Sequence, residues 1–329
     1  INGASHIFYE KKGKLFQAQT HFSSEQKLSD VIQQMAGNSN RMVNEASPIV
    51  DTRLADGSRV NIVLSPISID GAAVSIRKFP KTPILMEDLI RIGSITEEAA
   101  AFLKVLVAAG YNIFISGGTG SGKTTFLNAL SQYIPREERI ITIEDSAELR
   151  LVDKPNLVRL ETRNQMFDGV KPITIRDLIR TALRMRPERI VVGECRGEEA
   201  LDMLQAMNTG HDGSLSTGHA NSCRDMLSRL ETMVLMGMEL PLAAIRSQIA
   251  SGLDILVHLG RMRDKSRKVL AITEVIGMQD GEIVLKDLYR YVEKSPDVEM
   301  VCGKLQQMGT LFNQEKCKRA GITLTDTGE

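Results

Sequence analysis

One short stretch constrains the fold of this 329-residue chain more than any other. It fits the P-loop pattern G-x-x-x-x-G-K-[ST], which holds the phosphates of a nucleoside triphosphate. The apolar run 111–116 before it predicts a buried strand, and residues 125–133 after it predict a helix. A P-loop between a strand and a helix indicates a nucleotide site rather than an incidental glycine-rich turn. The stretch consists of Gly117, Gly118, Thr119, Gly120, Ser121, Gly122, Lys123, Thr124 and Thr125.

The residue types of this loop predict its ligands, ATP and Mg²⁺. Glycines let successive backbone N–H groups turn toward a phosphate without a Cβ in the way. The start of the following helix adds the positive end of its dipole. Lys123 is expected to reach the β- and γ-phosphates, and Thr124 to give its hydroxyl to Mg²⁺.

The composition argues against several other classes of function. Lys+Arg and Asp+Glu balance at 41 each, Trp is absent and aromatic residues make up 4%, so no nucleic-acid partner is expected. No apolar run approaches the length of a membrane span, and no signal-peptide pattern begins the chain. Scattered cysteines without a C-x-x-C pair disfavour zinc and suit a reducing cytosol. These are Cys195, Cys223, Cys302 and Cys317.

The rhythm of the sequence predicts two domains. Residues 1–80 alternate short β-prone runs with one amphipathic helix, which is typical of a small α+β domain. Pro80 and Pro83 interrupt regular structure, so a linker is expected over 81–94. From 95 to 329, helices alternate with apolar strands, and a hairpin over 269–289 closes the sheet. This order predicts an α/β domain with a mainly parallel sheet and helices on both faces.

Hydrolysis needs a carboxylate that orients or deprotonates a water molecule, and two places offer one. Glu194 follows the strand-like run 190–192, and Glu144 follows the run 140–143. Strand ends of a parallel sheet face the ligand crevice. We expect Glu194 to be the catalytic carboxylate and Glu144 to support the water or the metal. Both, with Thr124, are expected around Mg²⁺, partly through water. The alternative is a solvated charge at a strand end, and Gly193 stands where the usual Walker B aspartate would be.

Two histidines, His211 and His219, flank the strand-like residues 214–217. Their spacing suits no usual zinc pair. A histidine at a strand end can donate to a γ-phosphate and report its presence, and we assign this role to His219. The alternative for each is an ordinary polar turn residue. Cys195, beside Glu194, has no nearby base in the sequence and is expected to be inert.

Together these motifs resemble the secretion ATPase superfamily, which drives type II and type IV secretion and type IV pili. Within it the chain is most similar to the CpaF/TadA type, the motor of the tight-adherence (Flp/Tad) pilus, through residues 207–213 and 236–241. The four-cysteine zinc module of type II secretion ATPases is missing. Ser216-Thr217-Gly218-His219 differs slightly from the more common Gly-Thr-x-His. The matching boxes are Walker A (117–125), the aspartate box (143–149), the atypical Walker B (186–197) and the histidine box (210–222).

The resemblance implies a homohexameric ATPase with a PAS-like N-terminal α+β domain and a RecA-like P-loop domain. ATP turnover would move the domains, and inner-membrane platform proteins would convert that movement into pilus assembly or secretion. Such a protein is cytoplasmic and peripheral on the inner face of the cytoplasmic membrane. The sequence offers Arg53, Arg59 and Arg77 as a cation for the γ-phosphate from the small domain. The resemblance favours Arg59 and Arg77.

Other functions stay open at this point. Within the superfamily, the alternative is a type IV secretion or conjugation traffic ATPase. A nucleic-acid-dependent RecA-like motor would need a basic track or aromatic platforms, and neither is evident. A nucleotide-gated binding module would bind ATP and hydrolyse little of it.

Overall fold

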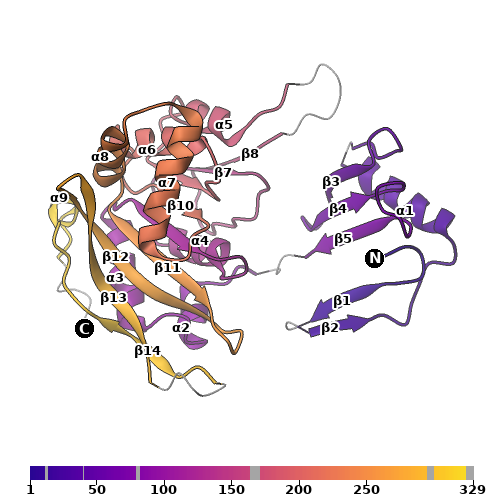
Figure 1. The fold of residues 1–329 in the computed structure, drawn as a ribbon, viewed down its shortest axis with the longest axis horizontal. Helices are drawn as coiled ribbons and strands as arrows, with labels where there is room; N and C mark the ends of the chain where they lie inside the picture. Colours follow the sequence, from indigo (N-terminus) through magenta and orange to yellow (C-terminus); the bar gives the residue numbers. More distant parts are fainter. Residues whose placement is uncertain (12–13, 40, 79–81, 164–170, 295–299, 324–329) are drawn as a thin grey trace. The chain divides into compact units, whose positions relative to one another are not determined.

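The computed structural model describes residues 1–11, 14–39, 41–78, 82–163, 171–294 and 300–323. The chain divides into two compact units, Ile1–Thr82 and Pro83–Glu329, which are described separately (Figure 1). Phe79, Pro80 and residue 81, at the expected domain boundary, lie outside the described residues. So do residues 12–13, between the first two strands.

The first unit has the expected α+β composition. Helix α1 begins where Ser24 accepts a hydrogen bond from the backbone N–H of Lys27 and so caps the first turn. Its apolar stripe, Leu28 and Ile32, packs on Ile62 of a three-stranded antiparallel sheet in the order β3-β4-β5. A separate hairpin pairs β1 with β2. The bounds are β1 Phe8–Lys11, β2 Lys14–Gln17, α1 Glu25–Gly37, β3 Ile49–Arg53, β4 Arg59–Val63 and β5 Ala73–Arg77.

The second unit is built on a nine-stranded sheet in the order β14-β13-β12-β11-β6-β10-β9-β7-β8. Strands β11, β6, β10, β9, β7 and β8 run parallel, and β12, β13 and β14 continue the sheet antiparallel. This confirms the expected α/β fold with a mainly parallel sheet. The strands are β6 Ile113–Gly117, β7 Ile140–Glu144, β8 Leu157–Glu161, β9 Arg189–Val192, β10 Leu215–Gly218, β11 Ile255–Arg261, β12 Arg267–Gln279, β13 Glu282–Glu293 and β14 Gly303–Gln307.

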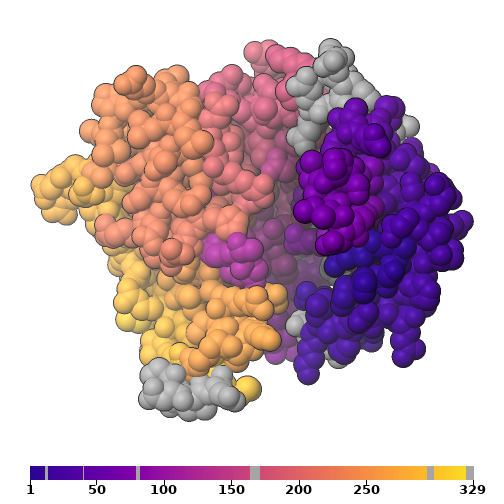
Figure 2. Space-filling model, turned by 45° about the vertical axis from the view of Figure 1, so that its right-hand side comes forward, coloured from indigo at the N-terminus to yellow at the C-terminus, as the bar shows by residue number. Residues whose placement is uncertain are grey.

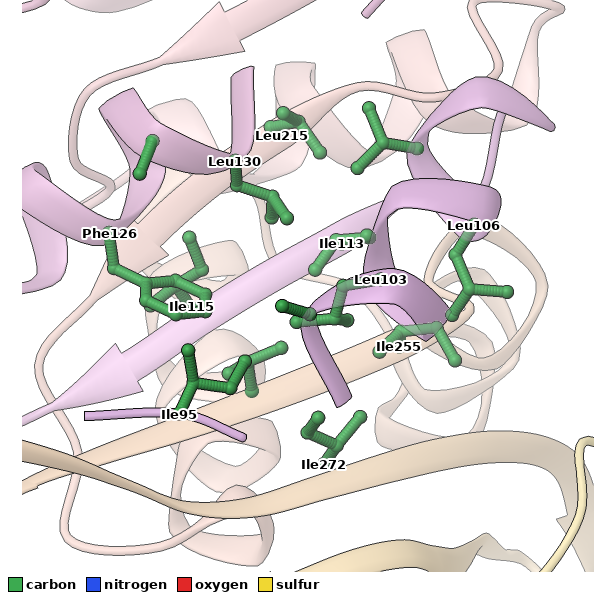
Figure 3. Packing of buried hydrophobic residues seen from close by; sticks show 14 of the residues in the cluster. Ile95, Leu103, Leu106, Ile113, Ile115, Phe126, Leu130, Leu215, Ile255 and Ile272 are labelled. Carbon is green, nitrogen blue, oxygen red and sulfur yellow. The ribbon is translucent and has the colours of Figure 1, made fainter. Parts of the chain in front are cut away.

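Helices cover both faces of this sheet (Figure 1). Because side chains alternate along a strand, Ile113 and Ile115 of β6 enter one core and Phe114 enters the other. In the first core, side chains from α3, α4 and the central strands point toward one another (Figure 3). The helices are α2 Met86–Arg91, α3 Glu97–Ala108, α4 Lys123–Ser131, α5 Ile175–Ala182, α6 Glu199–Asn208, α7 Cys223–Gly237, α8 Leu242–Gly252 and α9 Glu315–Ala320.

Part of the segment expected to be a linker is a helix. In α2, the Asp88 carboxylate accepts the backbone N–H of Leu85 and so closes the first turn. Met86 and Leu89 are buried in the core formed with α3 and α4. The prolines nearby predicted irregular structure, but burial of two large apolar side chains favours the helix.

The end of the chain adds two elements that the sequence analysis did not predict, β14 and α9. The segment before α9 is held to the sheet by the Glu274 carboxylate, which accepts the backbone N–H groups of Phe312 and Asn313. Lys316 of α9 then pairs with Asp212 and Asp254, each at 2.7 Å. These contacts join residues far apart in sequence, which local patterns do not reveal.

No helix in the part of the chain that the structure describes is both long and apolar enough to cross a bilayer.

Candidate nucleotide-binding and catalytic site

The loop after β6 has a backbone that requires glycine. A Cβ on Gly117 would lie 2.5 Å from the Ser121 Oγ and 2.6 Å from the carbonyl oxygen of Leu259. Gly120 and Gly122 have φ values of 72° and 95°, the left-handed region that disfavours other residues. Gly122 is the N-cap of α4 and offers no side chain to the first N–H groups of that helix. These donors are therefore left for a ligand, which is the arrangement that an anion-binding cradle requires.

Lys123 lies inside this loop, and its side chain is nearly buried. Its Nζ donates to the carbonyl oxygens of Gly117 at 3.0 Å and Gly118 at 3.2 Å. It also lies 3.3 Å from Nδ1 of His219. Burial lowers the pKa of the Lys123 ammonium, and the negative charge of Glu194 opposes that shift. The lysine is thus kept at the cradle by contacts that a phosphate can replace.

Glu194 comes next in the same cluster, two residues past the end of β9. Its Oε2 accepts a hydrogen bond of 2.7 Å from Nε of Arg196, whose Nη1 lies 3.3 Å from Asp145. Its Oε1 lies 2.9 Å from Nε2 of His219, a distance that allows an ion pair only if the ring is protonated. Burial and then the Lys123 charge lower the pKa of His219, which favours the neutral ring.

The second oxygen of Glu194 is therefore the unusual atom of the site. Oε1 is buried, and no hydrogen-bond donor with suitable geometry faces it among the residues that the structure describes. A buried carboxylate oxygen normally has a partner, because losing water without replacement costs free energy. An acceptor left open beside the P-loop fits a water molecule or a hydrated cation.

Strand β10 ties the two halves of the site together. Thr217 donates its hydroxyl to the carbonyl oxygen of Gly193 at 2.8 Å, and its own carbonyl accepts the N–H of Cys195 at 2.8 Å. The residues on either side of Glu194 are thereby fixed to the strand that ends just before His219. Burial raises the pKa of the Cys195 thiol strongly, so the thiolate is disfavoured.

Glu144 lies at the end of β7 and is buried against Gly193. A Cβ on Gly193 would come within 2.9 Å of the Glu144 Cγ. This contact gives a physical reason for glycine before Glu194, where a Walker B aspartate would otherwise stand. Glu144 Oε1 accepts the backbone N–H groups of Glu148 at 2.9 Å and Leu149 at 3.0 Å. Burial nevertheless raises its pKa to about 7.

Glu144 and Glu194 thus occupy different environments. Among the described contacts, no hydrogen bond or ion pair joins Glu144 to Lys123, His219 or Glu194. The loop after β7 uses the Glu144 carboxylate as a backbone acceptor, whereas Glu194 faces the P-loop lysine and histidine.

Replacing Gly193 with Ala is expected to destabilise the fold by about 1–3 kcal/mol, the usual cost of overpacking a core. The added methyl group meets the Glu144 Cγ, so the cost should largely vanish in a protein that also carries Glu144→Ala. Urea unfolding of the wild type, both single variants and the double variant, without nucleotide, measures the coupling. If the loss of unfolding free energy in the double variant equalled the sum of the losses in the two single variants, the methyl group added at position 193 and the Glu144 side chain would not be in contact.

The chemistry of the oxygens fits Mg²⁺ at this site. Thr124 is in the first turn of α4, directly after Lys123. A threonine hydroxyl and the open carboxylate oxygen of Glu194 are hard oxygen ligands of the kind that Mg²⁺ prefers, with water completing the shell. Glu144 fits this role less directly, because its Oε1 already accepts two backbone donors.

The other predicted residues lie as follows. His211 precedes β10 and lies outside this cluster. Its Nδ1 is 3.3 Å from the carbonyl oxygen of Ala206. In the first unit, Arg59 pairs in register with Arg53 on one side and with Arg77 on the other. Residues opposite each other in an antiparallel sheet share a face, so the three predicted arginines form one row.

Some residues of the site received no role from the sequence. Arg196, which bridges Glu194 and Asp145, stands inside the Walker B box, and its nearness to Glu194 in sequence was the available signal. Arg267 donates from Nε to the Gly120 carbonyl at 2.9 Å. It lies 147 residues from Gly120, so no local pattern indicates that contact.

Comparison with known proteins finds that this chain is similar to secretion system proteins. A family model described as "Type II/IV secretion system protein" matches residues 1–320. A protein of Mycobacterium tuberculosis strain H37Rv, provisionally named a conjugal transfer protein, is 35% identical over 289 residues, which are 86% of this chain and 81% of that protein. The type IV secretion system protein VirB11 of Brucella suis is 36% identical over 244 residues, 66% of this chain and 68% of that protein.

Among solved structures, the pilus retraction motor PilT with bound ADP resembles this chain with a TM-score of 0.59 and 16% identity. The match covers 100% of this chain and 91% of PilT. At this identity the similarity concerns the fold.

Proposed function

We propose, because this chain belongs to the type II/IV secretion system protein family, that it is a hexameric Mg-dependent ATPase motor for macromolecular traffic across a membrane. Proteins of this family hydrolyse nucleoside triphosphates, and the P-loop domain provides the corresponding site. To that activity we add the dependence on Mg²⁺, the assembly into a hexamer and the transport of macromolecules.

The observation that carries the proposal is the convergence of the P-loop lysine, His219 and Glu194. Lys123 begins α4 after the P-loop, His219 directly follows β10, and Glu194 lies two residues past β9. Adjacent members of the set lie 2.9–3.3 Å apart. A binding module needs only the P-loop. A carboxylate with an open oxygen beside the phosphate cradle adds what hydrolysis requires.

Each member has a proposed role. Lys123 binds the β- and γ-phosphates after leaving its carbonyl contacts, and Thr124 orients Mg²⁺. Glu194 holds and deprotonates the attacking water. His219, placed between Lys123 and Glu194, senses the γ-phosphate, because arrival of that group replaces the Lys123–His219 contact. Glu144 stabilises the loop after β7 through its backbone hydrogen bonds, and its proposed second role is to support the water or the metal.

The transported class is proposed from relatives. Those named here are a provisionally named conjugal transfer protein and a type IV secretion protein, which favours traffic through a type IV secretion or conjugation machine. The finer prediction of a tight-adherence pilus motor rests on residues 207–213 and 236–241 alone. Neighbouring genes for prepilin and paired platform proteins would favour the pilus, and genes for a secretion channel would favour traffic.

The assembly and the partners are proposed by analogy with the family. A homohexamer at the inner face of the cytoplasmic membrane would pass nucleotide-driven movement to inner-membrane platform proteins. Nucleic acid is not needed as a direct partner.

Lys123→Ala is expected to remove most ATP affinity without unfolding the protein, because the lysine supplies a point charge to the phosphates. Calorimetric titration with Mg-ATP measures binding. Light scattering across protein concentrations, with and without a non-hydrolysable ATP analogue, measures the hexamer, which should tighten with nucleotide in the wild type only.

Wild-type affinity in the Lys123→Ala protein would contradict the assigned site. A monomer under all conditions would contradict the hexamer alone. Stimulation of phosphate release by DNA or RNA would favour a nucleic-acid motor instead.

A further inference from the structure

The hairpin that joins β11 to β12 lies against the P-loop. Arg267 at the start of β12 donates to the Gly120 carbonyl at 2.9 Å, and its Cδ would lie 3.3 Å from a Cβ on Gly122. Nη1 of Arg261, at the end of β11, would lie 3.8 Å from a Cβ on Gly120. In the space-filling view, orange atoms of this region adjoin magenta atoms of the segment that contains the P-loop (Figure 2).

This hairpin is strongly basic and has a defined shape. Five of the eight residues 261–268 are Lys or Arg, and one is Asp. The Met262 N–H donates to the Ser266 carbonyl at 2.8 Å, and the Asp264 carboxylate accepts the Ser266 N–H at 2.9 Å. The turn is therefore held by its own hydrogen bonds, which fix the position of Arg261, the last residue of β11.

The cations of the hairpin differ in their partners. Arg263 pairs with Glu293 of β13, and Lys268 donates to the Gly93 carbonyl. Within the described ranges, neither Arg261 nor Arg267 pairs with a carboxylate. Arg267 instead donates a hydrogen bond to the Gly120 carbonyl. Arg261 is exposed, and its guanidinium lies at the exposed tip of the P-loop, residues 118–120.

The strand order of the sheet places Arg261 on a definite side of the P-loop. Strand β6 lies between β10 and β11. Glu194 and His219, which follow β9 and β10, mark one side of the P-loop as the end where the γ-phosphate is attacked. Arg261 and Arg267 stand on the other side, away from Glu194 and His219, where a guanidinium would face phosphates other than the γ-phosphate.

We propose that Arg261 is a nucleotide-binding residue that contacts the α- or β-phosphate, placed by a hairpin that Arg267 fastens to the P-loop. This inference rests on the proposed role of Glu194 at the γ-phosphate end. A guanidinium suits the task because its planar donors match phosphate oxygens in pairs.

The test is calorimetric titration of the full chain with Mg-ATP and with Mg-ADP. Arg261→Ala should weaken both nucleotides by a similar factor of about 10–100, the usual effect of losing a charged hydrogen bond. Arg261→Lys should recover part of the loss, and raising the salt concentration should narrow the difference from wild type. Arg263→Ala, which removes the same charge from the same hairpin, should change affinity by less than about threefold.

The outcomes separate this inference from the proposed function. If the wild type binds ATP, Lys123→Ala does not, and Arg261→Ala equals Arg263→Ala, the inference is wrong and the function stands. Loss confined to ATP would overturn the placement at the α- or β-phosphate. Failure of the wild type to bind nucleotide would overturn the proposed function itself.

Discussion

Glu194→Gln is expected to lower ATP turnover at least 100-fold while leaving ATP affinity nearly unchanged. A general base contributes about 10²–10⁴-fold, and glutamine keeps the size and the acceptor oxygen but cannot take a proton. The open oxygen of Glu194, 2.9 Å from the His219 ring, is where the water is expected. Phosphate release under multiple turnover, measured beside a nucleotide titration, separates the two effects.

Glu188→Gln provides a matched control for this change. Glu188 precedes β9, and its carboxylate accepts the backbone N–H of Arg139 at 2.6 Å. The Glu188→Gln substitution removes the same charge as Glu194→Gln, but at the opposite end of the same strand. Turnover in this control should stay within about twofold of wild type, as is usual for surface substitutions. A greater loss of turnover in Glu144→Gln than in Glu194→Gln would reverse the roles of the two carboxylates.

The same assays address His219. If the ring reports the γ-phosphate, His219→Ala should reduce the discrimination between ATP and ADP, because the Lys123–His219 contact is lost. Unchanged turnover and unchanged discrimination would remove the sensing role.

The parts of the fold that follow from local pattern were predictable from the sequence. The P-loop strand and helix and the mainly parallel sheet were expected, and the structure has them. The strand and helix are read from residues within a few positions of one another, and the parallel sheet from the alternation of such strands and helices along the chain.

The parts that depend on distant residues were not predictable. Helix α2 forms within a proline-flanked segment because Met86 and Leu89 find a core built by α3 and α4. The packing of Gly193 on Glu144 joins two boxes that the sequence shows as separate. The position of Arg261 beside Gly120 depends on the pairing of β11 with β6, which no window of sequence contains.

The arginine row of the first unit is expected to have the largest effect on rate. Arg53, Arg59 and Arg77 are register partners across β3, β4 and β5, so the three side chains start from one face of the sheet. A P-loop site leaves the developing charge on the γ-phosphate incompletely countered. An arginine from another domain or subunit contributes about 10³–10⁵ in rate where it has been measured.

Arg59→Ala or Arg77→Ala should therefore lower turnover by roughly 10³-fold while ATP affinity falls modestly, because the contact is expected only when the domains close on nucleotide. Lysine should restore little, since it lacks the planar fork of donors. Lys27→Ala, on the exposed side of α1 in the same unit, removes one positive charge away from the row and should leave turnover near wild type.

Mixing experiments decide whether the arginine acts within a subunit or across a boundary. An Arg77→Ala protein has an intact carboxylate, and a Glu194→Gln protein has an intact arginine row. Each is expected to be nearly inactive alone. If the arginine serves a neighbouring site, mixed hexamers contain sites with both groups and recover phosphate release. If it serves its own chain, no mixture recovers activity. Near-normal turnover in all three single alanine variants, Arg53→Ala included, would exclude the arginine row from the mechanism, because no other change in those proteins compensates for a lost cation at the γ-phosphate.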